Sequence, residues 1–151
     1  MNAPARPLRS LEVPTLEGFF GYHLRRASRI VLADLTKTLA PFDLRMITFS
    51  ALAVVHDNPN LTQSALAGAL DIEGPNLVQI LDKLEKRNLV ARRHATGDRR
   101  AKVLALTETG QQVFAQALAA VRHHDARMVQ KLGSTTVEQM QVNLNKVGKG
   151  S

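Results

Sequence analysis

The sequence contains no cysteine and no tryptophan, and aromatic residues make up only 4% of it. The absence of cysteine excludes disulfide bonds, thiolate metal sites and thiol-based redox sensing, and it agrees with a reducing cytosol. A core that is poor in rings but rich in Leu, Ala and Val favours packed helices over a sheet sandwich.

Long apolar segments are also missing. The longest clean apolar run, 51–55, is far shorter than the roughly 20 residues that span a bilayer. The first ten residues carry two arginines but no apolar stretch follows them, so the pattern does not indicate a secretory signal. We therefore expect a cytoplasmic protein.

Acidic residues are in deficit, with 13 Asp and Glu against 20 Lys and Arg and a net charge of +7. Such an excess favours a polyanionic partner, either nucleic acid or an acidic membrane surface, and the charge by itself does not distinguish the two. A chain of 151 residues is long enough for one domain with a real core.

The apolar periodicity predicts a mainly helical fold with one small β-hairpin. Residues 1–14 contain three prolines and no lasting period, which predicts a flexible arm. The predicted elements are a helix over 16–39 that stops at Pro41, a helix over 44–55, two helices between 62 and 86, two strands between 90 and 106, a helix that Thr107 caps and Gly133 ends, and a last helix from a capping box at Thr135 and Glu138 to about Val147.

The segment between Thr62 and Leu81 has the apolar spacing of a helix-turn-helix. Ile72 is placed to fill the turn, Ala67 and Gly68 are small where the two backbones are expected to approach, and Pro75 suits the first turn of the second helix. The residues expected on the inner faces are Leu66, Ala67 and Leu70 on the first helix and Leu77, Ile80, Leu81 and Leu84 on the second.

The opposite face of the second helix carries side chains that suit DNA. Asn76 and Gln79 can form paired hydrogen bonds with adenine, and Val78 can pack on a thymine methyl group. Lys83 and Lys86 lie further along, where phosphates are nearer. The alternative for this segment is a plain helical hairpin with a solvated polar face.

The next segment argues against that alternative because its charge is one-sided. A solvated face normally mixes signs, whereas here the only acid between 86 and 102 is Asp98, placed to pair with Arg100 and hold it extended. A hairpin tip with arginines can contact the minor groove or the flanking phosphates. The basic residues of this stretch are Lys86, Arg87, Arg92, Arg93, Arg99, Arg100 and Lys102.

The stretch DIEGPNLVQILDKLEKRNLVARRHATGDRRAKVLALTETG resembles the recognition helix, wing and following helix of the MarR family of bacterial regulators. The resemblance implies a homodimer in which 15–40 and 108–148 are dimerisation helices and 43–107 is a winged helix-turn-helix lobe. Two lobes would then bind a pseudo-palindromic operator in double-stranded DNA. By this analogy Asn76, Val78 and Gln79 face bases, and Arg100 enters the minor groove.

The chain departs from the family pattern at the start of this helix. Glu73, Asn76 and Val78 stand where members often have Ser or Thr, and Glu73 is a poor helix cap. Asn88 replaces a common glycine after the recognition helix, a change that costs little because Asn tolerates the left-handed conformation.

Members of the family commonly bind small anionic or phenolic molecules between the dimerisation helices and the lobe. The resemblance therefore implies a repressor that an aromatic acid, or its CoA thioester, releases from DNA. Arginine would hold the carboxylate, and Arg25, Arg26 and Arg29 would suit phosphates. The alternative is surface charge and ordinary dimer packing. The candidate effector residues are Tyr22, His23, Arg26 and Ile30, followed by Arg45, Met46 and Phe49.

Other functions find little support in the sequence. His123 and His124 are adjacent, so on a helix they point about 100° apart and do not converge on one metal ion. No cofactor motif, glycine-rich phosphate loop or nucleophilic constellation is present, and we do not expect an enzyme. The remaining alternative is an architectural DNA-binding protein without an effector, which the concentration of basic residues on the wing disfavours.

Overall fold

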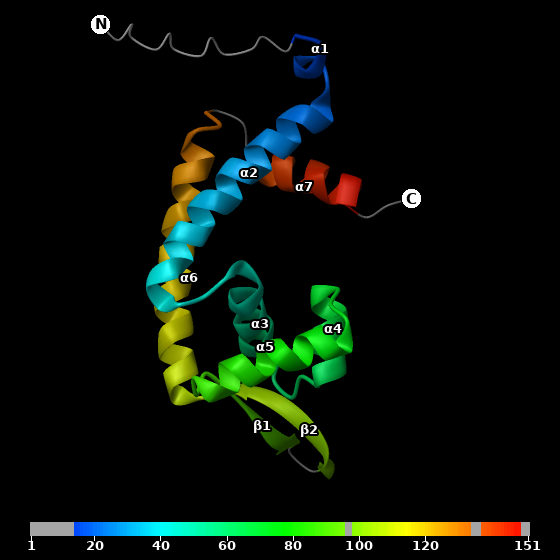
Figure 1. Cartoon of the computed structure of the whole chain (residues 1–151), viewed down its shortest axis with the longest axis vertical. Helices are drawn as coiled ribbons and strands as arrows, with labels where there is room; N and C mark the ends of the chain where they lie inside the picture. The colour runs from blue at the N-terminus through cyan, green and yellow to red at the C-terminus, as the bar shows by residue number, and fades with distance from the viewer. Residues whose placement is uncertain (1–13, 96–97, 134–136, 149–151) are drawn as a thin grey trace, which may run out of the picture. The chain divides into compact units, whose positions relative to one another are not determined.

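The computed structural model describes residues 14–95, 98–133 and 137–148, with the backbone only for 95 and 98–101. Figure 1 shows a mainly helical chain with one hairpin, which confirms the predicted fold class. The elements are α1 (Pro14–Glu17), α2 (Phe20–Leu39), a 3-10 turn η1 (Ala40–Phe42), α3 (Met46–Asp57), α4 (Gln63–Leu70), α5 (Gly74–Lys86), β1 (Val90–Ala95), β2 (Asp98–Leu106), α6 (Glu108–Gln130) and α7 (Val137–Gly148).

The chain divides into two compact units between Ala33 and Asp34, within α2. In the first unit, the prediction of one continuous helix from Leu16 is wrong, because the helix is interrupted at Gly18 and Phe19. The backbone N–H of Phe19 donates to the carbonyl of Leu16 at 3.0 Å and closes a turn there. Glycine has a low helix propensity, which explains why the break falls at this point.

The core of the second unit is built from leucine. The large side chains that are fully buried all belong to this one residue type. The main aromatic in the core is Phe114, whose ring stacks on Phe49 with 5.7 Å between centroids. The ring-poor core expected from composition is therefore the one observed, and its fully buried leucines are Leu39, Leu52, Leu66, Leu77, Leu81, Leu84 and Leu89.

Strands β1 and β2 form an antiparallel hairpin, with Val90 opposite Leu106. Leu61, two residues before α4, adds a short bridge: its carbonyl accepts a hydrogen bond from the N–H of Leu104 at 2.8 Å. Contacts of α5 with α4 and with β1 place α5 between the first helix of the pair and the hairpin, as Figure 1 shows. The two predicted strands are thus confirmed.

The helix α6 begins directly against the turn between α5 and β1. Thr107 caps α6, because its hydroxyl accepts from the N–H of Gly110 at 2.9 Å and donates to the carbonyl of Asn88. Asn88 has a φ of +54°, so it adopts the predicted left-handed conformation. A Cβ added to Gly110 would lie 1.9 Å from the carbonyl oxygen of Leu89, so only glycine fits there.

The terminal helices expose apolar side chains. On α7 the side chains of Val142, Leu144 and Val147 are 49%, 40% and 64% exposed. The predicted cap of this helix, Thr135, lies outside the described residues, as does most of the predicted N-terminal arm. In the first unit, the exposed apolar residues are Leu16, Phe19, Phe20, Leu24, Ile30, Val31 and Leu32.

Within the part of the chain that the structure describes, no single helix has both the length and the apolar character to cross a membrane, although one bent pair, Phe20–Phe42 with Met46–Asp57, meets those criteria together.

Candidate nucleic-acid interface

The helix-turn-helix is formed by α4 and α5. Thr62 caps α4 by accepting a hydrogen bond from the N–H of Ala65 at 3.2 Å, and Asp71 ends the helix in the left-handed conformation. Ile72 then packs against the core, and its N–H donates to the carbonyl of Ala67 at 3.0 Å. The turn is therefore filled by Ile72, as predicted.

The two faces of α5 are divided as the sequence predicts. Leu77 and Leu81 are fully buried against the core, whereas Asn76 and Gln79 are exposed on the other face. Val78 is 37% exposed, which leaves its methyl groups accessible. Lys83 and Lys86 are exposed further along the helix. One helix thus presents amides, a small apolar side chain and then ammonium groups to the outside.

The start of α5 has no side-chain cap. Glu73 occupies the N-cap position without a capping hydrogen bond, as expected for this residue, and Pro75 lies in the first turn. Gly68 does not have the packing role predicted from the sequence. It is exposed, and a Cβ there would meet no atom within 4 Å, so no other backbone packs closely against this position.

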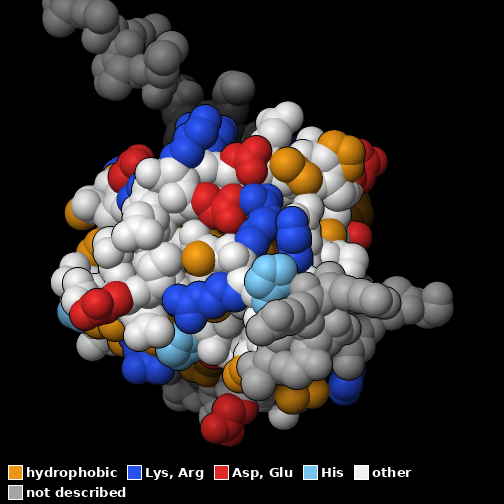
Figure 2. Space-filling view, turned by 90° about the horizontal axis from the view of Figure 1, so that it is seen from below, with side chains coloured by type: hydrophobic (Ala, Val, Ile, Leu, Met, Phe, Trp, Pro, Cys, Tyr) orange, Lys and Arg blue, Asp and Glu red, His pale blue; other side chains and the backbone are white. Residues whose placement is uncertain are grey.

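Arg92, near the start of β1, is bound to acidic residues of α5. Its guanidinium donates to the Glu85 carboxylate and lies 3.4 Å from the Asp82 carboxylate, both on α5. The space-filling view from the hairpin end shows basic side chains in contact with acidic ones (Figure 2). The sequence prediction placed Arg92 at DNA; in the structure its charge is engaged with these two carboxylates and ties β1 to α5.

Arg93 and His94, the next residues of β1, are exposed. Together with His56 and Gln111 they line an open cavity of about 330 Å³. Strand alternation places Arg93 on the face opposite to Arg92, so the two arginines have different surroundings. The predicted wing-tip contacts are Arg99 and Arg100, with Asp98 orienting Arg100, and the side chains of all three lie outside the described residues.

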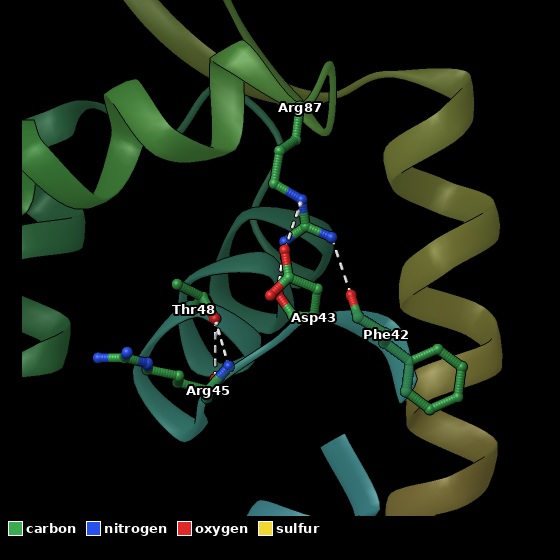
Figure 3. Close-up of polar contacts among 5 residues, drawn as sticks. All are labelled: Phe42, Asp43, Arg45, Thr48 and Arg87. Atoms are coloured by element: carbon green, nitrogen blue, oxygen red, sulfur yellow. Dashed lines mark hydrogen bonds and ion pairs between the residues drawn. The ribbon is translucent and has the colours of Figure 1, made fainter. Parts of the chain in front are cut away.

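Arg87, at the C-terminal end of α5, contacts the turn before α3 (Figure 3). Its Nη1 donates to the carbonyl of Asp43 at 2.6 Å, and its Nη2 donates to the carbonyl of Phe42 at 2.8 Å. Its Nε also lies 3.7 Å from the Asp43 carboxylate. In the sequence, Arg87 is one residue of a basic stretch. Nothing in the sequence indicates that Arg87 binds backbone carbonyls, or that these belong to residues more than 40 positions away.

Among the candidate effector residues, those of the first unit lie on α2. The Arg26 guanidinium donates to the Tyr22 hydroxyl at 3.4 Å and lies 5.5 Å from the centre of the Tyr22 ring. His23 donates from Nε2 to the carbonyl of Glu17 at 2.7 Å, so it links α2 to α1. Ile30 is 54% exposed.

The candidate effector residues of the second unit lie at the start of α3. The Thr48 hydroxyl accepts from the N–H of Arg45 at 2.8 Å and fixes the first turn. In Figure 3 the Arg45 guanidinium extends away from Arg87, and no described residue accepts a hydrogen bond from it. Met46 is 54% exposed, whereas Phe49 is half-buried and stacked on the core.

A further polar cluster joins α6 to the C-terminal part of α2. His124 is buried and donates from Nδ1 to the Asp34 carboxylate at 2.7 Å, and Arg127 donates to the same oxygen at 2.6 Å. These two hydrogen bonds, that from His124 first, hold the pKa of the Asp34 carboxyl below its usual value. His123 is exposed, so the two adjacent histidines have separate environments.

Known proteins with this arrangement are DNA-binding regulators. A model of the MarR family matches residues 44–102. The transcriptional repressor CouR, solved with a 23-mer DNA duplex, is 33% identical with a TM-score of 0.83, over 92% of this chain and 99% of CouR. CouR from Rhodococcus jostii RHA1, solved with p-coumaroyl-CoA, is 29% identical with a TM-score of 0.79, over 90% and 96%.

A MarR family protein of Mycobacterium tuberculosis in complex with DNA is also similar, with 26% identity and a TM-score of 0.70 over 86% of this chain and 98% of that one. The family match covers the helix-turn-helix and most of the hairpin, and the structural matches extend over nearly the whole chain. The chain therefore belongs to the MarR family of winged helix-turn-helix transcriptional regulators.

Proposed function

We propose that this protein is a homodimeric repressor that binds a pseudo-palindromic operator through α5 and the hairpin wing. The observation that carries the proposal is the division of α5: buried leucines fix the helix, while Asn76, Gln79 and Lys83 are exposed together on its outer face. A helix held in this way enters the major groove with its first turns against the base edges. The DNA-bound structure of CouR supports the same use of the fold.

The proposal gives separate tasks to separate residues. Asn76 and Gln79 would bond base edges, Val78 would pack on a thymine methyl, and Lys83 would contact a phosphate. Arg93 and the wing-tip arginines would contact phosphates or the minor groove. The lobe over 43–107 would carry all of these contacts.

Fluorescence anisotropy with a labelled duplex from the chain's own promoter region tests operator binding. Gln79→Ala removes a base contact worth about 1–3 kcal/mol, so we expect roughly a 5- to 150-fold loss on the operator and little change on random duplex. Gln116→Ala, an exposed glutamine on α6, is the matched control and should leave both affinities unchanged. Equal affinity for promoter and random duplex at about 150 mM salt would refute specific binding.

The exposed apolar side chains of the terminal helices support the dimer. Faces of this kind are covered in stable assemblies, and the helices over 15–40 and 108–148 are the ones proposed to associate. Val142→Glu would place a charge in that interface, and we expect a monomer by light scattering together with weaker operator binding. Gln141→Glu adds the same charge at the neighbouring exposed position and tests for charge alone. A Val142→Glu protein that remains a dimer would contradict this assignment.

For the effector, we propose an aromatic acid carried as its CoA thioester. CouR binds p-coumaroyl-CoA, and α2 of this chain exposes Arg25, Arg26 and Arg29 within two turns, a density of positive charge that suits CoA phosphates. Arg45, at the N-cap of α3, offers a guanidinium without an acceptor among the described residues, and Met46, the first residue of α3, offers an exposed apolar side chain.

Isothermal titration with p-coumaroyl-CoA, free p-coumarate and CoA separates the parts of such a ligand. We expect the thioester to bind most tightly and to weaken operator binding. Arg26→Met and Arg45→Met should each lower its affinity, and Arg122→Met, at an exposed position on α6, should not. If free p-coumarate binds more tightly than the thioester, a CoA thioester is excluded as the effector and the free aromatic acid takes its place.

A further inference from the structure

Arg87 connects α5, which is proposed to bind DNA, to the turn before α3, near candidate effector residues. It is the residue directly after α5, and its guanidinium reaches the turn Phe42–Asp43, which precedes α3. Two of its nitrogens donate to two successive backbone carbonyls, and the planar guanidinium holds these two donors in a fixed geometry that an ammonium group does not have. The contact therefore fixes the direction of the turn as well as its distance from α5.

The turn itself is held in an uncommon conformation. Asp43 has a φ of +50°, and its N–H donates to the carbonyl of Ala40 at 2.9 Å. Residues other than glycine seldom adopt this conformation, and Asp does so more readily than most, so the surrounding contacts contribute to holding it. The hydrogen bonds from Arg87 to this turn are contacts of that kind. The Arg87 side chain is 33% exposed, so its environment is only partly solvated.

We infer that Arg87 is a positioning residue for DNA binding, which fixes the C-terminal end of α5 to the Phe42–Asp43 turn so that turn and recognition helix move together. This inference rests on the proposed function of α5. The candidate effector residues Arg45 and Met46 follow the turn by two and three positions. A ligand that shifts the start of α3 would therefore shift α5 through Arg87, which gives the effector a physical route to the DNA-binding helix.

The competing role for Arg87 is a direct contact with a DNA phosphate, as its place in the basic stretch suggests. The two roles differ in the salt dependence of binding, because only a residue that neutralises a phosphate releases a counterion. Lys86 is the matched control, since it is adjacent, exposed and positively charged. The variants are Arg87→Gln, Arg87→Lys and Lys86→Gln, each checked for a native thermal unfolding profile.

Operator affinity is measured for each variant by anisotropy across a salt series. We expect Arg87→Gln to weaken operator binding about tenfold with the salt slope of wild type, and Lys86→Gln to reduce the slope by roughly 1. Arg87→Lys keeps the charge but not the paired geometry, so it should restore only part of the loss. A reduced slope in Arg87→Gln, or full affinity in Arg87→Lys, would assign Arg87 to a phosphate and overturn the inference.

The coupling to the effector is tested with p-coumaroyl-CoA on the same proteins. We expect the thioester to weaken operator binding of wild type by more than tenfold but that of Arg87→Gln by less than threefold, while its affinity for the variant, measured by titration, stays within threefold of wild type. A variant that responds as fully as wild type would overturn the coupling. Wild type that does not respond would instead refute the proposed effector, and the salt series would still decide the role of Arg87.

Discussion

Among the described glycines, Gly110 is the one where substitution by alanine should destabilise the protein most. Gly110 lies in the first turn of α6, where a Cβ would be 1.9 Å from the carbonyl oxygen of Leu89 and 2.8 Å from its carbonyl carbon. Both are backbone atoms that cannot rotate away. The carbonyl of Leu89 also accepts from the N–H of Thr107 at 3.1 Å, so moving it breaks the junction between α5, β1 and α6.

Overpacking of a well-packed site costs about 1–3 kcal/mol, and a contact this short against backbone belongs at the upper end, at about 3 kcal/mol. Out of a total stability of about 5–15 kcal/mol this is a large fraction, and it corresponds to a melting temperature lower by about 6–12 °C. Thermal and denaturant unfolding followed by circular dichroism, at one protomer concentration, measures the change.

The control is Gly68→Ala on α4, where a Cβ meets no atom within 4 Å. Because alanine has the higher helix propensity, this substitution should stabilise the protein by up to about 1 kcal/mol. The same chemical change is thus expected to have opposite signs at two helical glycines. A loss below about 1 kcal/mol in Gly110→Ala would show that the junction relaxes easily, and the close-packing argument would be wrong.

Three further predictions concern the fold. Asn88→Ala should lower the free energy of unfolding by about 1 kcal/mol, since alanine is strained at φ of +54°, whereas Asn88→Gly should not lower it. Leu77→Ala should cost about 2–5 kcal/mol by denaturant unfolding, because the side chain is fully buried beneath the outer face of α5. A cost near that of an exposed leucine would show that α5 is not held by the core. The hydrogen bonds from His124 and Arg127 lower the folded-state pKa of Asp34, so its carboxylate stabilises the protein above the unfolded pKa of about 3.9 and loses this effect as the pH falls through the lower folded value. Asp34→Asn should therefore be less stable than wild type at neutral pH, and the unfolding midpoints of the two proteins should converge at low pH. Midpoints of wild type and variant that still differ well below pH 3 would contradict this.

The sequence predicted the helix-turn-helix and its faces because local patterns determine both. Helical spacing identified the buried Leu77 and Leu81, and their burial leaves Asn76 and Gln79 outside. The left-handed Asn88 and the cap at Thr107 were likewise predicted from residue types with strong local preferences. The break at Gly18 was missed because the apolar spacing continues through it.

The polar contacts could not be predicted because their partners are distant in sequence. Arg87 and Arg92 look alike in the chain, yet one bonds the carbonyls of a turn more than 40 residues earlier and the other the carboxylates of α5. The partner of His124, Asp34, is 90 residues away. The composition of the basic stretch shows that it is positively charged, but only the fold shows which of its cations are already paired within the protein.

The single tyrosine has a practical consequence for experiments. The chain has no tryptophan, so its ultraviolet emission comes almost entirely from Tyr22, whose hydroxyl accepts a hydrogen bond from Arg26. The unmodified protein thus carries one intrinsic fluorophore, on the helix proposed to hold the effector, while the DNA-binding lobe contributes no tyrosine or tryptophan signal. A change in its emission lifetime on adding a ligand would report on the surroundings of Tyr22 on α2, and the protein needs no label for that measurement.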